Sequence, residues 1–528
     1  MMNVLKTPSF FRPISRPSSP APTPPLPLRS ESAPAPGVDR TARPLSKLGL
    51  STFRRPSPSS VAPTQTMPTL LIQDGSYLEM LSLKLSEAVS RALAQPPGPT
   101  LPYELVAGKR PIPQGRGHAL GALIASELKA NQDKPHLYRA ILRSLHRPLS
   151  VLLTNLSAHL LPLLASPLFH SPAAPTVQNQ NPNPTQLHAL AIATFAQELL
   201  ETFDDIGLGL DADPRDDGLK PIRKGLASVI NRIVGPLVDG IRNELVPVIE
   251  ALETPNTSQF KAVTGTRAHT IYHPSIVTLQ TLMPIYAKTL ARYTAPATSH
   301  TIIATFLIAV VWKGLVALSN RPFVASAPPS PDLTSNRKLP AYNTPVTPPA
   351  SRFTLKLPPS RPPSPPMVTV PANASADAQA LFDLLNTLPR PSGDKGSSRL
   401  ATEAVDEAFE ALKALSALLG VIHSKSNHDR MMDDMAREIN TLTKNIPLLV
   451  ALPALLHTYA DPRLTSVTNL LGLSESEYRS VCLSGIGRAE ECAPVIAHRV
   501  MDVLRRHVPH GIIYGWLQLE TTDLDAEQ

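Results

Sequence analysis

The sequence of 528 residues contains only two cysteines, Cys482 and Cys492. A chain of this length with one pair of thiols cannot rely on a disulfide framework, which excludes the class of small secreted disulfide scaffolds. No secretory signal peptide is recognisable, and Pro8 and Pro13 interrupt the basic first residues where a mitochondrial presequence would need an amphipathic helix. We therefore expect an intracellular, cytoplasmic protein.

Catalytic and metal-binding motifs are also missing. The sequence has no Gly-x-Ser-x-Gly elbow and no His-Glu-x-x-His helix, and its cysteines lack a Cys or His neighbour at zinc-ligand spacing. The acidic loop 211–218 starts like a calcium loop, but Arg215 and Ile222 stand where oxygen ligands are needed. The sequence therefore predicts no metal, no cofactor and no enzyme activity.

Strand signals are scarce as well, because no run of residues sustains apolar and polar alternation. Leu, Ala, Val and Ile recur instead at helical spacing. We predict an all-α fold of two irregular helical blocks, bundle-like or solenoid-like, at residues 74–320 and 375–520, followed by a short tail at 521–528. Whether the two blocks pack together is left open by the pattern.

Serine and proline mark the expected helix boundaries. Serines at N-cap positions, two of them in Ser-x-x-Glu capping boxes, predict three helix starts, at Ser76, Ser375 and Ser474. Prolines inside apolar-periodic segments predict interruptions, at Pro148, Pro236 and Pro247.

Positive charge is concentrated in two stretches dense in Pro and Ser. Residues 1–73 carry a balance of +7 and residues 321–374 a balance of +5, whereas the whole chain has a net charge of +8. The rest of the chain is therefore slightly acidic. Because the two stretches have too little apolar periodicity to form a core, we predict a disordered N-terminal tail and a disordered linker between the helical blocks.

Phosphorylation motifs recur in these two stretches. Three serines lie in Arg-x-x-Ser-Pro sequences, a basic and proline-directed kinase consensus: Ser19, Ser57 and Ser364. A phosphate at each would reduce the positive charge of the stretches. We predict proline-directed kinases as partners and a charge switch as the consequence.

Polyproline motifs accompany the serines. The segments 24–29 and 356–362 match the two orientations of ligands for SH3-type grooves. The docking residues predicted from these matches are Pro24, Pro27, Arg29, Lys356, Pro359 and Pro362. SH3-type domains are therefore expected partners.

A basic, glycine-rich loop at residues 108–121 precedes an expected helix. Free N–H groups and the dipole at a helix start favour anions. The glycine spacing fits neither a Walker loop nor a dinucleotide fingerprint. Two interpretations stay open: a flexible loop between helices, or a contact for phosphate or an inositol lipid.

The longest apolar run is at residues 301–318, and eighteen residues reach about 27 Å as a helix, which approaches a bilayer span. Lys313 lies inside the run, where a lipid-facing charge is costly. A helix that is apolar on every side is also what the centre of a helical bundle needs. The run predicts a buried core helix, with a membrane helix as the alternative.

These patterns predict a non-enzymatic intracellular scaffold or adaptor whose helical blocks bind proteins and whose basic segments carry regulated docking sites. The alternative is a membrane-associated protein, held by the 301–318 helix or by basic tails on an anionic lipid surface. An enzyme with an unusual helical active site is a third class. Nucleic-acid binding is disfavoured, because the basic residues of the two stretches are interspersed with prolines and not with aromatic residues.

Overall fold

The computed structural model describes the helical part of the chain with several gaps. It covers residues 69–97, 105–106, 108–209, 218–255, 272–295, 297–322, 374–391, 396–424, 432–460, 466–508 and 511–526. Of the predicted segments, almost all of the N-terminal tail and the stretch 323–373 lie outside these residues.

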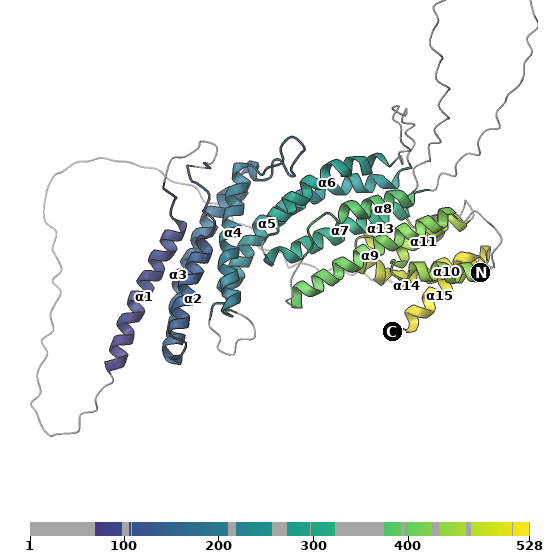
Figure 1. Ribbon diagram of the computed structural model, residues 1–528. Helices are drawn as coiled ribbons and strands as arrows, with labels where there is room; N and C mark the ends of the chain where they lie inside the picture. Colours follow the sequence, from purple (N-terminus) through teal and green to yellow (C-terminus); the bar gives the residue numbers. More distant parts are fainter. Residues whose placement is uncertain are drawn as a thin grey trace, which may run out of the picture. The chain divides into compact units, whose positions relative to one another are not determined.

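The described residues form an all-α structure, as predicted (Figure 1). Seven helices precede the 323–373 stretch: α1 (Thr69–Leu93), α2 (Arg116–Ala130), α3 (Pro135–Ala165), α4 (Pro184–Asp205), α5 (Lys220–Glu250), α6 (Pro274–Tyr293) and α7 (His300–Ser319). Eight follow it: α8 (Ala374–Leu385), α9 (Gly396–Ser424), α10 (Met432–Thr443), α11 (Leu448–Tyr459), α12 (Val467–Leu471), α13 (Glu475–Val481), α14 (Ile486–His507) and α15 (Ile512–Ala526). Three short 3-10 turns are added, η2 (Pro167–Phe169), η3 (Ala251–Glu253) and η4 (Ala297–Ser299), and within the described ranges the only β-type pairing is an isolated bridge between Val106 and Lys109.

Helix α7, the longest apolar run of the sequence, lies in the core of the helical unit. It packs on α5 and η3, which precede it, and on α9 and α11, which follow the 323–373 stretch. Trp312 is 2% exposed, and its indole Nε1 donates a hydrogen bond to the backbone carbonyl of Leu483 at 2.8 Å. Lys313 reaches the rim, where its Nζ lies 2.7 Å from the carboxylate of Glu250. The charge inside the apolar run is therefore paired at the surface.

The packing of α7 answers the question of whether the two predicted helical blocks touch. Helices before and after the 323–373 stretch contact each other at the α7 and α9 pair and at the α6 and α8 pair. All the described helices belong to one compact unit, residues 68–528. Burying one shared apolar helix therefore joins the two blocks.

The serine caps are confirmed at one position and wrong at two. Ser474 precedes α13, and its hydroxyl accepts a hydrogen bond from the backbone N–H of Glu477 at 3.2 Å. Ser76 lies inside α1, which begins seven residues earlier at Thr69. Ser375 lies in the first turn of α8 and donates its hydroxyl to the carbonyl of Ser416 on α9 at 2.9 Å. A helix–helix contact therefore uses the hydroxyl that was expected to cap.

The predicted interruptions at internal prolines are also wrong. Helix α3 continues through Pro148, and α5 continues through both Pro236 and Pro247. An internal proline removes one hydrogen bond and strains one turn, at a cost of about 3 kcal/mol. Both helices are 31 residues long and bury an apolar stripe along their length, so packing outweighs the local penalty.

We expect proteolysis within residues 323–373 to leave two fragments that stay associated. The apolar contacts of α7 with α9 and α11 hold the fragments together without the peptide bond. Size-exclusion chromatography after limited digestion should give one peak that contains both fragments. Two separate peaks under native conditions would show that the blocks are independent.

Candidate functional site

The predicted docking and phosphorylation residues all lie outside the described residues. This applies to Ser19, Ser57, Ser364, Pro24, Pro27, Arg29, Lys356, Pro359 and Pro362. The structure instead describes the residues that hold both ends of the 323–373 stretch. These ends form the candidate functional site.

A buried ion pair joins the two ends. Arg321 follows α7, and its Nη1 lies 2.6 Å from Oδ2 of Asp377, in the first turn of α8. The two side chains are only 7% and 1% exposed. An acidic side chain in a first helical turn is also favoured by the helix dipole. Although 55 positions separate the two residues in sequence, the structure brings them into direct contact.

His273 completes the polar cluster around Asp377. Its backbone N–H donates to Oδ1 of Asp377 at 3.0 Å, and its Nδ1 accepts from the backbone N–H of Ser275 at 3.2 Å, which caps α6. On the other edge of the ring, Nε2 lies 3.2 Å from the carbonyl of Thr254. A neutral imidazole with its proton on Nε2 satisfies both ring contacts. Burial lowers the pKa of His273, and the charge of Arg321 lowers it further.

Helices α7 and α8, which lead into this cluster, pack closely against each other. A Cβ added at Gly314 on α7 would lie 2.7 Å from a methyl group of Leu381 on α8. Only a glycine permits this approach without a shift of the neighbour. Gly314 therefore allows α7, which Arg321 follows, to lie close to α8, which carries Asp377.

The ion pair corrects the predicted charge distribution. The sequence assigns Arg321 to an exposed basic stretch, but its charge is buried and neutralised by Asp377. The residues 323–373 keep five Lys and Arg against Asp332. The stretch between the anchored ends is therefore basic even without Arg321.

The anion that contacts the glycine-rich segment 108–121 is a side chain of the protein itself, the carboxylate of Glu198. Glu198 on α4 is 4% exposed and accepts hydrogen bonds from the backbone N–H groups of Gly115 at 2.7 Å and Gly117 at 2.9 Å. A Cβ at Gly117 would lie 2.7 Å from Cβ of Glu198, so this approach needs a glycine. These hydrogen bonds connect the start of α2 to α4. The N–H groups of Gly115 and Gly117 already bind Glu198, so they are not available to an outside anion.

Arg116, the first residue of α2, also has an internal partner. Its guanidinium donates to the carbonyl of Ala92 at 3.0 Å and to the carbonyl of Ala94, at the C-terminal end of α1. A cation at this end of a helix satisfies orphan carbonyls and the helix dipole. The local charge therefore caps α1.

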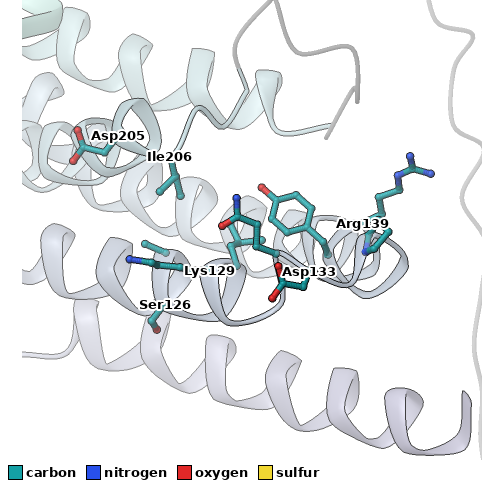
Figure 2. Close-up of a pocket in the computed structure, with 11 residues that line it drawn as sticks. Ser126, Lys129, Asp133, Arg139, Asp205 and Ile206 are labelled. Carbon is teal, nitrogen blue, oxygen red and sulfur yellow. The ribbon is translucent and has the colours of Figure 1, made fainter. Parts of the chain in front are cut away.

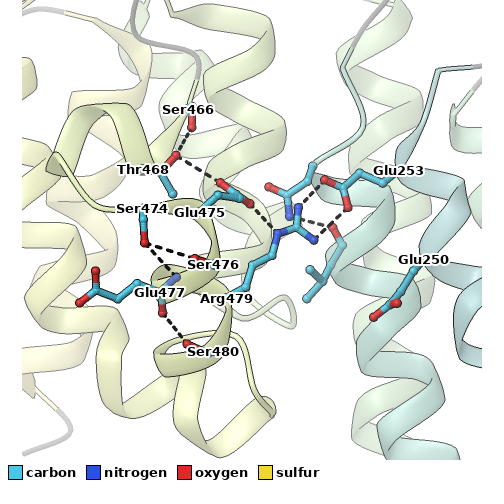
Figure 3. A network of polar contacts seen from close by, with 12 residues as sticks. Glu250, Glu253, Ser466, Thr468, Ser474, Glu475, Ser476, Glu477, Arg479 and Ser480 are labelled. Carbon is cyan, nitrogen blue, oxygen red and sulfur yellow. Dashed lines mark hydrogen bonds and ion pairs between the residues drawn. The ribbon is translucent and has the colours of Figure 1, made fainter. Parts of the chain in front are cut away.

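A second polar network links η3, which precedes the 323–373 stretch, to α13, which follows it (Figure 3). Arg479 on α13 contacts both carboxylate oxygens of Glu253 in η3, one at 3.0 Å, and its Nε lies 2.5 Å from Glu475. The pKa of Arg479 is raised, first by its hydrogen bonds to Glu253. Because both carboxylates hold the guanidinium, it is unavailable to an outside anion.

This network borders a cavity of about 200 Å³, which also includes Tyr478 and His457. Tyr478 is 3% exposed, its hydroxyl has no hydrogen-bond partner among the described residues, and burial raises its pKa. The hydroxyl oxygen has no measurable access to solvent. The Tyr478 hydroxyl is therefore shielded from solvent, and the Glu253 and Glu475 carboxylates that line the cavity are paired with Arg479.

A larger surface cavity of about 750 Å³ lies between the ends of α2 and α4 and the start of α3 (Figure 2). Lys129, Asp133, Arg139 and Asp205 are spread around it, and Arg139 extends away from both carboxylates. Within the described residues, no group of three or more His, Cys, Asp or Glu side chains could hold a metal ion. The two thiols are free; Cys482 is buried, and desolvation raises its pKa to about 11. The acidic loop 211–217 lies outside the described residues.

No known protein family, curated protein sequence or solved structure matches this chain.

Sequence reasoning missed Asp377, His273 and Glu198, which organise the polar clusters. Asp377 was visible as an acid in the first turn of a helix directly after a basic stretch. The contact with Arg321 was not visible, because no local pattern relates residues on opposite sides of a segment of about 50 residues.

We expect R321M to lower the free energy of unfolding by about 3–5 kcal/mol, because it leaves the carboxylate of Asp377 buried without a counter-charge. The double variant R321M/D377N should recover much of this loss, since the amide oxygen still accepts from His273. Urea unfolding followed by circular dichroism measures both. R437M, which breaks an exposed pair with Asp434, is the matched control and should change stability little. Equal losses in R321M and R321M/D377N would contradict a buried charge effect.

We expect His273 to make the protein less stable in acid. Its folded pKa lies below the unfolded value of about 6.5, so the unfolded chain takes up a proton first and unfolding becomes easier as the pH falls below that value. H273N keeps an oxygen that can cap α6 but cannot titrate. The variant should match wild-type stability at pH 8 and lose less between pH 6.5 and pH 5. A parallel pH dependence in both proteins would exclude His273 as the source.

Proposed function

We propose that this protein is a non-enzymatic, cytoplasmic scaffold or adaptor in which the helical unit presents residues 323–373 as a docking segment. The observation that carries the proposal is the buried contact of Arg321 with Asp377, which holds both ends of the segment at one place on the fold. A linker between independent blocks would not need such an anchor. A segment that binds partners gains from this anchor a fixed point of attachment on the helical unit.

The length of the segment supports this function. Between the two anchors lie 55 residues, far more than the two to eight that usually connect helices. Lengthening a closed segment costs only about 0.6 kcal/mol for each doubling, so the helical unit can carry a long insertion at little cost. Long connections of this kind usually serve a function.

The docking chemistry follows from the sequence of the segment. Lys356, Pro359 and Pro362 have the spacing of a polyproline ligand with a basic residue at one end. The N-terminal stretch offers a second match in the opposite orientation, with Pro24, Pro27 and Arg29. Partners with SH3-type grooves are therefore proposed, and two matches in one chain permit bivalent binding.

Phosphorylation supplies the proposed regulation. Ser364 lies two residues after Pro362, so a phosphate there places a charge of about −1.5 to −2 beside the docking motif. Ser19 and Ser57 are the corresponding sites in the N-terminal stretch. Proline-directed kinases would weaken contacts that depend on the basic residues.

Membrane association through residues 301–318 is less well supported. Helix α7 would have to leave its contacts with α5, α9 and α11 before its apolar side chains could meet lipid. Lys313 is already paired with Glu250 at the rim. The packing of this helix favours the scaffold.

We expect K356A/P359A/P362A to lose proteins with SH3-type domains that the full-length chain captures. R337A/P345A/P348A, which also replaces one basic residue and two prolines of the segment, is the matched control and should retain them. Affinity capture with quantitative mass spectrometry, followed by titration of the recovered domains, measures the difference. Identical partner sets for both variants and the wild type would rule out docking at this motif.

A further inference from the structure

The outward face of α3 carries a row of arginines that make no ion pair within the described residues, and the one acid that borders the same groove as Arg147 is Glu79 of α1. Arg139, Arg143 and Arg147 are exposed and recur every four residues, so they lie on one side of the helix. His136 and His146 are exposed on the same side. Within the described residues, none of the three arginines is paired with a carboxylate, and Figure 2 shows Arg139 directed away from Asp133 and Asp205.

This arrangement does not serve the stability of α3. Like charges four residues apart on a helix repel, and the row contains two such pairs. Between residues 134 and 197 the sequence has no Asp or Glu at all, so no neighbour along the helix relieves the repulsion. A helix built only for stability would alternate the sign of its charges. The row is therefore suited to an anionic partner outside the chain.

Exposed aliphatic side chains continue the row toward the end of α3. Val151, one turn after Arg147, is 50% exposed, and Leu161 is 51% exposed. Arg147 and Val151 border a groove of about 520 Å³ together with Leu83 of α1, which is 72% exposed. Leu168, directly after α3, is 61% exposed. One face thus combines arginines over about 12 Å of helix with adjoining apolar surface.

Two helices of the described chain are long and apolar enough to cross a bilayer by length and composition, α3 and α7. Only 28% of the apolar window of α3 is buried, against 67% for α7. The packing of the unit therefore buries most of the apolar window of α7 and leaves most of the apolar window of α3 outside the core. The exposed helix is the one with free arginines.

We propose that this face of α3, with Arg139, Arg143, Arg147, Val151 and Leu161, binds the surface of an anionic phospholipid membrane. The arginines contact lipid phosphates and carboxylates, and the aliphatic side chains enter the boundary between headgroups and acyl chains. The helix lies on the membrane and does not span it, because its opposite face is buried against α1, α4 and α5.

The composition of the face favours lipid over an acidic protein or a nucleic acid. The apolar part consists of exposed aliphatic side chains, whereas hot spots between proteins are rich in Trp and Tyr. Nucleic-acid sites combine cations with stacking aromatics or amides that read bases, and the exposed side chains of this face include neither Phe, Tyr nor Trp. Cations beside exposed Leu and Val are typical of membrane-surface helices.

The first test measures binding to vesicles of equimolar phosphatidylcholine and phosphatidylserine with the full-length chain. R139Q/R143Q/R147Q removes three charges and keeps good helix formers, and it should weaken partitioning on the order of 100-fold. R40Q/R43Q/R54Q removes the same charge from the N-terminal stretch and is the matched control. Equal losses in both variants would overturn the proposal, because binding would then follow total charge alone.

The second test asks whether the aliphatic part enters the lipid. Trp312 and Trp516 are buried, so a tryptophan introduced at an exposed position reports its own surroundings. Brominated lipid in the same vesicles should quench the added fluorescence of L161W and leave that of L400W, at an exposed leucine of α9, unchanged. An L161W signal that stays unquenched in vesicle-bound protein would overturn the proposal.

Competition experiments distinguish an anionic membrane from two other partners of this face, an acidic protein and a nucleic acid. Polyglutamate and RNA should displace the protein from vesicles only weakly at moderate salt, because neither uses the aliphatic side chains. Vesicle binding that survives R139Q/R143Q/R147Q, together with capture by polyglutamate or RNA that this variant loses, would assign the face to an acidic polymer and overturn the lipid proposal.

Discussion

The structure depends on covering one helix that is apolar on nearly every side. Helix α7 cannot be buried by the elements that precede it alone, and it packs on helices from both sides of the 323–373 stretch. Burial of apolar surface is the main favourable term in folding and has no direction of its own. The shared helix therefore explains why the described helices belong to one unit.

Polar contacts specify which helices meet, which apolar burial alone does not. Asp377 receives Arg321 and the backbone of His273, Glu198 receives the first N–H groups of α2, and Glu253 and Glu475 hold Arg479. The contacts of Asp377, Glu198 and Glu253 join residues that are distant in sequence. Asp377 and Glu198 are buried, so removing their partners leaves a costly buried group. These acids set which helices meet and at what position. They also occupy cations that would otherwise attract outside anions.

Function is consequently expected on surfaces where such pairing fails. The outward arginines of α3 have no ion-pair partner within the described residues, and the sequence of residues 323–373 contains five Lys and Arg against Asp332. A scaffold that docks proteins through polyproline segments and rests on an anionic membrane through α3 would bring its partners to that membrane. The two proposed activities use separate parts of the chain, so they are compatible.

The sequence by itself determined the helical class, the apolar character of α7 and the Ser474 cap, because spacing and capping depend on neighbours within a few residues. The docking and phosphorylation residues also come from the sequence and stay predictions. Only the tertiary structure decided that α3 and α5 continue through their prolines, that Arg321 is buried and that Glu198 fills the glycine-rich loop. Packing energy and paired charges between distant segments decide these features, and no local pattern encodes such pairs.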